Sequence, residues 1–365
     1  MNIGASDLPA LRRLALLRLE GRANDDAEVR ALGGSLDVDP WVAPLLAGAE
    51  RVDAGGNRVA VHPYQKWRGA HWRLVALAEL AIDRSVAGAA GPIEEAFTAV
   101  VEWLEAPGRA ARARPVDGRV RMCASQDGNA LWAACQLGWA ADPATARMAE
   151  RLIAWQWPDG GWNCDPRPDA THASFHETWT PLRGLAAYAA SGPAPALRAA
   201  SGAAAAAAAE LLLRHRLVEH ERGEGLIDPA FLRLRWPPYW HYDLLAGLGA
   251  LRTAGAAYLL DPRAGPALAR LDRMRAGDGR WHAGGRWWHR PGSDGANVEL
   301  VDWGADGEAA MLTLGALAIC AAADSAAGDV EPHRTVVRPQ ARAGGADPGA
   351  ADAGAIGAPM GAGRG

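Results

Sequence analysis

The chain has 365 residues, of which 49% are hydrophobic and 22% charged, and its formal net charge at pH 7 is -4. A chain of this length can bury one large core or two modest ones. The negative balance provides no basic surface, which excludes nucleic acid as an expected partner and disfavours binding to an anionic membrane. Nearly all the cations are arginine, with Lys66 the only lysine. This bias gives arginine clusters little weight as evidence of function.

The cysteines and the apolar segments indicate the cellular environment. Cys123, Cys135, Cys164 and Cys320 lie far apart and include no Cys-x-x-Cys pair, which disfavours a disulfide framework and favours a reducing compartment. The first residues alternate leucine with arginine, unlike a signal peptide, and no stretch approaches the ~20 apolar residues of a membrane span. We therefore expect a cytoplasmic protein without a transmembrane segment, while peripheral contact with a membrane stays open.

Helical spacing of apolar residues dominates the chain, and strands are expected to be scarce. Two or three short helices are predicted within residues 7–50, followed by a loop at 51–67. The helices predicted after this loop cover residues 71–82, 92–104, 129–139, 143–155, 174–190, 195–217, 239–254, 262–275 and 308–323. Every second helix, starting with the first of these, is apolar on nearly all sides, which is typical of a buried helix; the others are amphipathic.

The buried helices recur every ~45 to 70 residues, which is typical of stacked helical units. The turn after an outer helix also repeats, because Pro158–Trp162 and Gly277–Trp281 share an Asp-Gly pair followed by a tryptophan. Such a pair suits a tight turn. We therefore divide the chain into an N-terminal helical segment at 1–59, a repeat domain at 60–323, and a tail at 324–365. The tail is rich in alanine, glycine and proline and is predicted to be disordered.

These residues carry a family resemblance. Gln156–Trp162, preceded by Leu152 and Ile153, resembles the Q-x-x-x-G-x-W repeats of squalene and hopene cyclases, and the helix pairs are similar to those of the β subunits of protein prenyltransferases. Further segments look like a bacterial branch of this superfamily: 66–72, 123–131, 155–165, 174–178, 237–243 and 301–304. Over residues 60–323 the resemblance implies an all-α fold of the α/α toroid type, in which inner helices surround a central cavity and outer helices surround them.

In such a ring the first turns of the inner helices face the cavity, and this sequence places polar and aromatic residues there. The candidates for acid–base catalysis are His71, Asp127, His176, Glu177, His241 and Asp243. The candidates for the lining of the substrate pocket are Trp72, Asn129, Trp179, Tyr239, Trp240, Asp302 and Trp303. Tryptophan faces stabilise cations by roughly 0.5 to 2 kcal/mol each, although the same rings would also fill the core. Helix capping explains Asp127 and Asn129 equally well.

A metal site is a second interpretation of the same helix ends. His172 and His176 are four residues apart and share a helix face if the helix begins by Thr171. Further ligands could approach from neighbouring turns: His241, Asp243, Cys164 and Asp165. Zinc accepts such ligands. The resemblance to protein prenyltransferases implies a zinc pattern of an aspartate, a cysteine and a histidine. Ala170 falls at the aspartate and His172 at the cysteine, while His241 heads a comparable helix, so the pattern is broken here. Zinc at His172, His176 and His241 therefore stands beside the alternative that His172 and His176 bond to carboxylates.

The resemblance predicts an enzyme that acts on an isoprenoid or another apolar substrate in the central cavity. The Asp-x-Asp-Asp acid motif of squalene cyclases is missing from its expected place, since the nearest string, Asp37–Pro40, is better explained as a helix-start turn. No DDxxD run for magnesium diphosphate is present. Whether Arg183 or Arg73 faces inward to receive a diphosphate stays open.

Two further functions stay open. The chain could be a toroid that binds a ligand or a partner protein without catalysis, because one fold hosts several functions. It could also act on carbohydrates, with Glu177 paired to Asp243 or Asp127 as the two carboxylates that glycoside hydrolysis needs.

Overall fold

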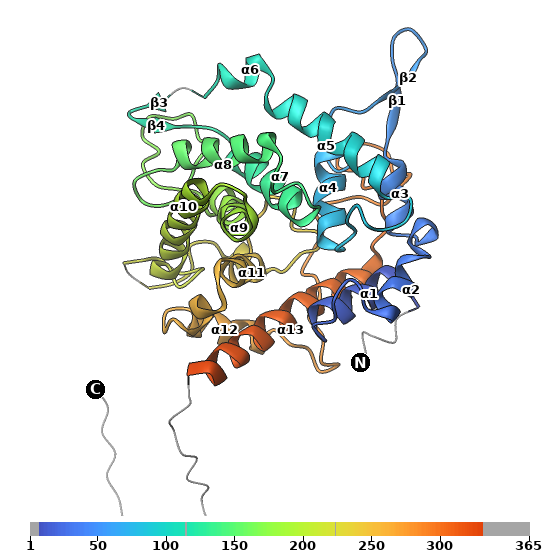
Figure 1. Ribbon diagram of the computed structural model, residues 1–365. Coiled ribbons are helices and arrows are strands. Elements are labelled where there is room, and N and C mark those ends of the chain that lie inside the picture. The colour runs from blue at the N-terminus through green and yellow to red at the C-terminus, as the bar shows by residue number, and fades with distance from the viewer. Residues whose placement is uncertain (1–6, 114, 223, 331–365) are drawn as a thin grey trace, which may run out of the picture. The chain divides into compact units, whose positions relative to one another are not determined.

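The computed structural model describes residues 7–113, 115–222 and 224–330, which form a mostly helical fold (Figure 1). The all-α class predicted from the helical spacing is confirmed. The helices alternate in sequence between strongly buried and partly exposed ones, as the apolar patterns predict.

Two short antiparallel strand pairs occur among the described residues. They are β1 (Glu50–Val52) with β2 (Arg58–Ala60), and β3 (Pro115–Val116) with β4 (Arg119–Val120). The first pair replaces part of the loop predicted at 51–67. Its turn is fixed by the Asp53 carboxylate, which accepts hydrogen bonds from Gly55 N (2.8 Å) and Asn57 N (2.9 Å). Such side-chain to backbone bonds stabilise a tight turn.

The N-terminal segment shares its core with the helices that follow. It contains α1 (Pro9–Arg18), α2 (Ala27–Gly33), the 3-10 turn η2 (Leu36–Val38) and α3 (Val42–Ala47). Asp39 is buried and accepts hydrogen bonds from Ala10 N (3.0 Å) and Trp41 N (2.8 Å), so it caps the start of α3 and ties it to α1. Leu14 of α1 belongs to the main hydrophobic cluster. Over its described residues, the part predicted at 1–59 therefore packs into the common core.

Beyond residue 60 the helices form consecutive pairs. The pairs are α4 (Ala70–Glu79) with α5 (Ala90–Leu104), α7 (Ala124–Gln136) with α8 (Pro143–Trp155), α9 (Phe175–Ser191) with α10 (Pro195–Arg214), and α11 (Leu244–Ala254) with α12 (Gly265–Arg273). The first helices of the pairs contact one another in chain order, and α11 contacts the last helix, α13 (Gly304–Val330). We call α4, α7, α9, α11 and α13 the core helices, and α5, α8, α10 and α12 the covering helices. The short elements α6 (Pro107–Ala110), η3 (Pro229–Leu232) and η4 (Ala256–Leu260) lie between them in sequence.

Two core helices begin five residues away from their predicted starts. α7 begins at Ala124 rather than at 129, with Cys123 as its N-cap residue. α11 begins at Leu244 rather than at 239, because Asp243 Oδ1 accepts a hydrogen bond from Ala246 N (2.9 Å) and caps the helix there. An N-cap aspartate is among the strongest helix-start signals.

The predicted tail begins with helix. α13 continues through Val330, so residues 324–330 of the predicted tail are helical. The run AAADSAAG, which follows Cys320, is rich in alanine, the residue with the highest helix propensity. The rest of the predicted tail, 331–365, lies outside the described residues.

The two repeated turns form the same clamp. In each, the tryptophan indole donates to a carbonyl of the preceding covering helix, and the tryptophan N–H donates to a threonine of the next core helix. The indole bonds are Trp162 Nε1 to Leu152 O (2.9 Å) and Trp281 Nε1 to Leu271 O (2.7 Å), and the backbone bonds are Trp162 N to Thr178 Oγ1 (3.3 Å) and Trp281 N to Thr313 Oγ1 (3.1 Å). Gln156 also donates to Gly160 O (2.8 Å), and Arg275 to Gly279 O (3.0 Å), so an arginine replaces the repeat glutamine in the second turn.

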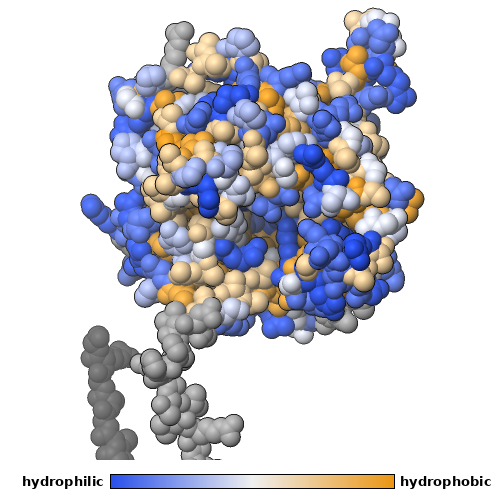
Figure 2. Space-filling view, viewed as in Figure 1, coloured by the Kyte–Doolittle hydropathy of each residue, from blue (hydrophilic) through white to orange (hydrophobic). Residues whose placement is uncertain are grey.

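Two helices among the described residues are long and apolar enough to cross a membrane by length and composition. They are Pro195–Arg214 and Gly304–Ala327, whose most apolar windows are 44% and 50% buried inside the fold. This differs from the expectation that no stretch approaches a membrane span, because alanine runs raise the mean hydropathy of both helices. Core helices of soluble proteins meet the same criteria, so the finding alone assigns no membrane location. Figure 2 shows hydrophilic and hydrophobic residues interspersed over one face.

Candidate functional site

The core helices line a cavity of about 410 Å³. Its apolar wall includes Trp132, Trp179, Trp236, Leu245 and Met311. Its polar wall contains four arginines and two carboxylates: Arg18, Arg183, Arg235, Arg252, Glu79 and Asp243. The volume lies within the range of about 300–1,000 Å³ that is usual for small-molecule sites.

Arg183 of α9 joins three core helices at the cavity wall. Its guanidinium lies over the rings of Trp132 (3.9 Å to the centroid) and Trp179 (4.6 Å). It forms an ion pair with Glu79 (2.7 Å) and donates a hydrogen bond to Asn129 Oδ1 (2.8 Å). Burial lowers the pKa of Arg183, and the charge of Glu79 opposes this shift. Of the two arginines whose direction the sequence left open, Arg183 lines the cavity.

Arg73 is used to join α4 to α3. It donates to Leu45 O (2.7 Å) and Leu46 O (2.9 Å) at the end of α3. Its guanidinium also fills the space beside Gly48, where an added Cβ would lie 2.4 Å from Arg73 Nη1. These contacts give Arg73 a structural role.

The cavity wall carries more positive than negative charge. Four arginines minus two carboxylates leave an excess of two positive charges. Glu79 is shared between Arg183 (2.7 Å) and Arg18 (3.5 Å). Arg252 Nε is buried and has no hydrogen-bond partner among the described residues. Burial lowers the pKa of Arg235 and of Arg252. A desolvated cation that is incompletely paired is unfavourable, so the wall of the cavity favours an anionic ligand.

Asp243 combines lining of the cavity with capping of α11. Its Oδ1 accepts from Ala246 N (2.9 Å) and its Oδ2 from Arg235 N (3.2 Å). Burial raises the pKa of Asp243 to about 6, and the backbone hydrogen bonds oppose this shift. Because both oxygens act as acceptors, the contacts favour a capping carboxylate over a proton donor.

His176 and His241 lie near each other, with ring centroids 6.1 Å apart. His176 Nδ1 accepts a hydrogen bond from Tyr242 N (2.8 Å). His241 stacks between Trp240 (3.9 Å) and Trp287 (3.7 Å). Burial lowers the pKa of both histidines, that of His241 to about 3. Both rings are therefore neutral at pH 7, and each is held by its neighbours.

The metal ligands predicted from three histidines are not brought together. His172 is exposed, and its ring contacts Thr171 Oγ1 (3.0 Å). α9 begins at Phe175, after His172, so His172 and His176 do not share a helix face. Within the described chain, His172, His176 and His241 form no group whose ligand atoms lie within 4.8 Å of one another. The prediction required an earlier helix start than the chain adopts.

His71 and Trp72, in the first turn of α4, are buried. The ring of His71 lies 5.3 Å from that of Tyr64 and 5.6 Å from that of Trp103, and neither of its nitrogens has a hydrogen-bond partner in the described part of the chain. Burial lowers the pKa of His71 to about 3. Trp72 and Tyr239 line a void of about 10 Å³ that shares Glu79 and other wall residues with the cavity.

One predicted pocket residue, Tyr239, contacts a carboxylate that the sequence did not single out. Tyr239 donates its hydroxyl hydrogen to buried Glu299. Burial raises the pKa of Glu299 to about 7. Trp303 is buried close by in sequence, whereas Asp302 is exposed and accepts from Gly304 N (3.1 Å) at the start of α13. Asp302 is thus placed as a capping residue.

Glu299→Gln is expected to change how stability depends on pH. Glu299 ionises near 4.5 in the unfolded chain and near 7 in the fold, so its contribution to stability is complete below pH 4.5 and is lost as the pH rises through 7. The amide cannot ionise. Between these limits we expect the free energy of unfolding of the wild type to fall by about 2–3 kcal/mol relative to Glu299→Gln. Urea unfolding followed by circular dichroism measures this. Glu94→Gln, at an exposed position of α5, should follow the wild type at every pH.

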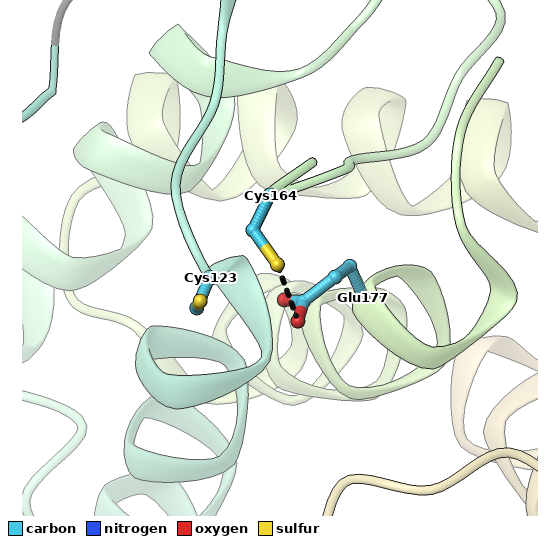
Figure 3. A group of neighbouring side chains, drawn as sticks. All are labelled: Cys123, Cys164 and Glu177. Atoms are coloured by element: carbon cyan, nitrogen blue, oxygen red, sulfur yellow. Dashed lines mark hydrogen bonds between the residues drawn. The ribbon is translucent and has the colours of Figure 1, made fainter. Parts of the chain in front are cut away.

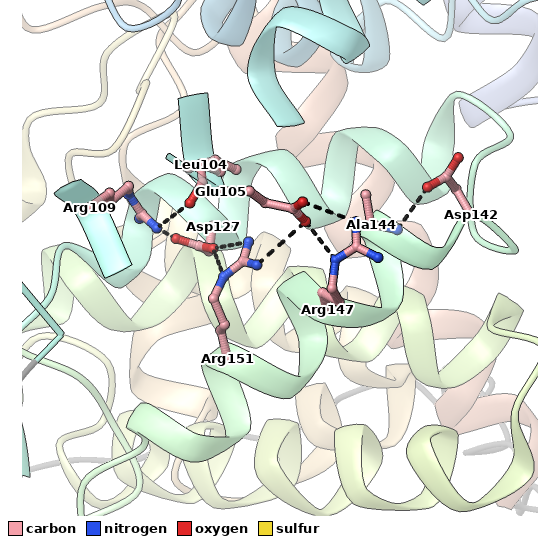
Figure 4. A network of polar contacts seen from close by, with 8 residues as sticks. All are labelled: Leu104, Glu105, Arg109, Asp127, Asp142, Ala144, Arg147 and Arg151. Atoms are coloured by element: carbon pink, nitrogen blue, oxygen red, sulfur yellow. Dashed lines mark hydrogen bonds and ion pairs between the residues drawn. The ribbon is translucent and has the colours of Figure 1, made fainter. Parts of the chain in front are cut away.

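Asp127 lies in a buried ion network rather than at a helix cap (Figure 4). Its Oδ2 pairs with Arg109, and its Oδ1 accepts from Arg151 Nε (2.9 Å). Arg151 also approaches Glu105 (3.8 Å), which pairs with Arg147 (2.7 Å) nearer the surface. Because arginines occupy both oxygens of Asp127, the contacts favour a structural role.

Figure 3 shows a group that sequence reasoning did not assemble: Cys123, Cys164 and Glu177, with ligand atoms that all lie within 4.8 Å of one another. Cys123 occupies the N-cap position of α7, where the helix N-terminus favours a thiolate. Glu177 is in the first turn of α9, and burial raises its pKa. Hydrogen bonding between the thiols lowers the pKa of Cys123 and raises that of Cys164. Cys123 and Cys164 each lie in the segment that leads into a core helix. This shared position is the sequence signal from which their proximity could have been inferred.

No protein-family model, curated protein or solved structure matches the chain. The proposal of an α/α toroid therefore rests on the motifs in the sequence and on the order of the helix contacts.

Proposed function

We propose that the chain is an α/α toroid of the terpenoid cyclase and protein prenyltransferase type, whose central cavity binds a small organic anion with an apolar body. An isoprenoid diphosphate has this chemistry. The toroid is supported by core helices that contact one another in chain order, of which the first four each contact a covering helix. It is also supported by the tryptophan clamp, which occurs twice with the same hydrogen bonds at Trp162 and Trp281.

The excess of guanidinium groups beside tryptophan faces carries the binding proposal. Trp132 and Trp179 offer flat apolar surface, and core helices add leucine and methionine side chains. Arg252 has a buried Nε without a hydrogen-bond partner within the described residues, so its guanidinium has capacity left for an anion. Charge-assisted hydrogen bonds from arginine to phosphate or carboxylate are among the strongest available to a protein.

The cavity residues support binding more directly than a specific reaction. Glu79 is already paired with Arg183 and Arg18, and Asp243 accepts two backbone hydrogen bonds. Neither carboxylate is arranged to give a proton to a substrate. The carbohydrate alternative has less support, because the contacts of Asp243 and Asp127 occupy the oxygens that a catalytic pair would need.

Three probes test the proposal by isothermal titration calorimetry: geranyl diphosphate, geraniol and inorganic pyrophosphate. If the cavity recognises both the apolar body and the anionic group, geranyl diphosphate should bind at least about tenfold more tightly than geraniol or pyrophosphate. This corresponds to a difference of about 1.4 kcal/mol in binding free energy. Geraniol binding as tightly as its diphosphate would show that the arginines do not recognise an anion. If neither organic probe bound with a Kd below about 1 mM, which corresponds to a binding free energy of about -4 kcal/mol, the assignment would be contradicted.

Arg252→Gln should weaken geranyl diphosphate binding about tenfold or more, because it removes a charge-assisted hydrogen bond worth about 1.5–3 kcal/mol. Geraniol binding should change little. Arg30→Gln, at an exposed position of α2, is the matched control and should bind both probes as the wild type does. Unchanged diphosphate affinity in a folded Arg252→Gln variant would place the anion elsewhere.

A further inference from the structure

A cluster of potential metal ligands lies apart from the residues that line the cavity. The sulfurs of Cys123 and Cys164 and a carboxylate oxygen of Glu177 all lie within 4.8 Å of one another (Figure 3). In tetrahedral zinc sites, Zn–S distances of about 2.3 Å and Zn–O distances of about 2.1 Å put ligand atoms roughly 3.5–3.8 Å apart. Side-chain rotations that move each ligand atom by about 1 Å would therefore bring all three atoms within bonding distance of one ion.

The scaffold holds each ligand from a different direction. Cys123 occupies the N-cap position of α7, and Glu177 lies in the first turn of α9, a helix that packs closely on α7. Cys164 follows the clamped turn, whose Trp162 is bonded to both α8 and α9. Arg121 holds the next residue in place by donating to Asp165 O (2.9 Å). Ligands fixed by the surrounding fold lose less entropy when a metal binds.

Glu177 is oriented so that one oxygen faces the thiols. Its Oε2 accepts a hydrogen bond from Ser125 N (2.8 Å), while its Oε1 lies 3.4 Å from Cys164 Sγ. The side chain is buried, with a relative exposure of 6%, and neither of these partners is a cation. Arg109, whose charge also acts on Cys123, is already paired with Asp127. A buried carboxylate beside two thiols is therefore a place where a divalent cation would be stabilised.

The ligand types select among metals. Thiolates favour zinc and other borderline or soft ions over magnesium and calcium, which prefer oxygen ligands. Three protein ligands with a fourth position for water are typical of zinc sites that act on a substrate, whereas structural sites use four protein ligands. Cys123 and Cys164 are both partly exposed, so solvent has access to the cluster.

We propose that Cys123, Cys164 and Glu177 bind one Zn²⁺ ion, with a water molecule at the fourth position. This set differs from the ligand positions implied by the resemblance to protein prenyltransferases, which fall at Ala170, His172 and His241. The site does not depend on the proposed cavity ligand, and either could fail without the other.

Metal titration of the full-length chain tests the site. Protein without a histidine tag is purified under reducing conditions, stripped with a chelator and titrated with Zn²⁺ or Co²⁺. We expect one equivalent of metal, and a cobalt spectrum with thiolate-to-metal charge-transfer bands and the intense visible bands of a tetrahedral site. Cys123→Ser and Cys164→Ser should each lower zinc affinity by at least about 100-fold, since removal of a second-shell partner alone costs about 10–100-fold.

The chain supplies its own controls. Cys135 and Cys320 are also free thiols but lie outside the cluster, so Cys135→Ser and Cys320→Ser should bind metal as the wild type does. Glu177→Gln should weaken binding but keep the thiolate bands. Should a cluster variant fail to fold, alkylation of the wild type followed by mass spectrometry replaces it: zinc should protect Cys123 and Cys164 and leave the other two thiols unaffected.

Three results would overturn the site. One is the absence of stoichiometric zinc binding by the stripped wild type. Another is equal zinc affinity in the wild type and in folded Cys123→Ser and Cys164→Ser variants. The third is a Cys123–Cys164 disulfide in protein purified under reducing conditions, which would make the pair a covalent cross-link instead of a ligand pair.

Discussion

Asp127→Ala is expected to lower the free energy of unfolding by about 3–5 kcal/mol, the usual cost of removing one partner from a buried ion pair. Asp127 is fully buried, and both its oxygens bind arginines. Arg109, with 4% relative exposure, would stay buried between the rings of Trp103 and Trp155 after losing its counter-ion. Desolvation of this guanidinium would no longer be offset. Urea unfolding of the purified variant, followed by circular dichroism, measures the change.

Arg147→Ala is the matched control for this network. Arg147 pairs with Glu105 at 2.7 Å, but their side chains are 48% and 30% exposed. Exposed pairs contribute about 0–1 kcal/mol, so this variant should stay within about 1 kcal/mol of the wild type. If Asp127→Ala were equally mild, the carboxylate would not be needed for the fold, and its place among the catalytic candidates would gain support.

Gly128→Ala is expected to destabilise the fold by about 3 kcal/mol through a clash between two core helices. A Cβ at position 128 would lie 2.3 Å from Pro181 N and 2.5 Å from Thr180 C. Both are backbone atoms of α9, so no side-chain rotation relieves the overlap. On the facing side, Gly184 allows the same close approach, since its own Cβ would lie 2.6 Å from Gly128 O. Thermal and urea unfolding should both report the loss.

Gly202→Ala separates this clash from the general effect of replacing a helical glycine. Gly202 is in α10, and an added Cβ would meet no atom nearer than Ala189 Cβ at 3.7 Å. Alanine is the better helix former by roughly 0.5–1 kcal/mol, so this variant should be slightly more stable than the wild type. A Gly128→Ala protein as stable as Gly202→Ala would mean that α7 and α9 can separate without loss.

The position of one helix could be predicted from the local signals at its start. The predicted helix at 143–155 coincides with α8 because Asp142 caps it, with its Oδ1 accepting from Ala144 N (2.8 Å), and Pro143 occupies the first turn. The repeated Asp-Gly-x-Trp pattern also predicted the two equivalent turns in which Trp162 and Trp281 form the clamp. These features depend on residues close together in the chain.

The candidate sites depend on contacts between distant segments, which local patterns do not encode. Cys123 and Cys164 meet only because α7 packs against α9, and Glu177 turns toward them because Ser125 N holds its other oxygen. The cavity arginines were given little weight in a chain so rich in arginine. Burial distinguishes Arg183 from the exposed arginines, and this burial is a property of the assembled helices.

The single lysine offers a way to label the chain without disturbing its cysteines. Lys66 is exposed, and its amine lies over the rings of Trp67 (5.3 Å) and Trp240 (5.5 Å). No other lysine side chain occurs in the sequence, so amine-directed reagents have one side-chain target. This target lies beside Trp240, whose ring stacks on His241. A fluorophore attached there would report on this aromatic surface while Cys123 and Cys164 stay free to bind metal.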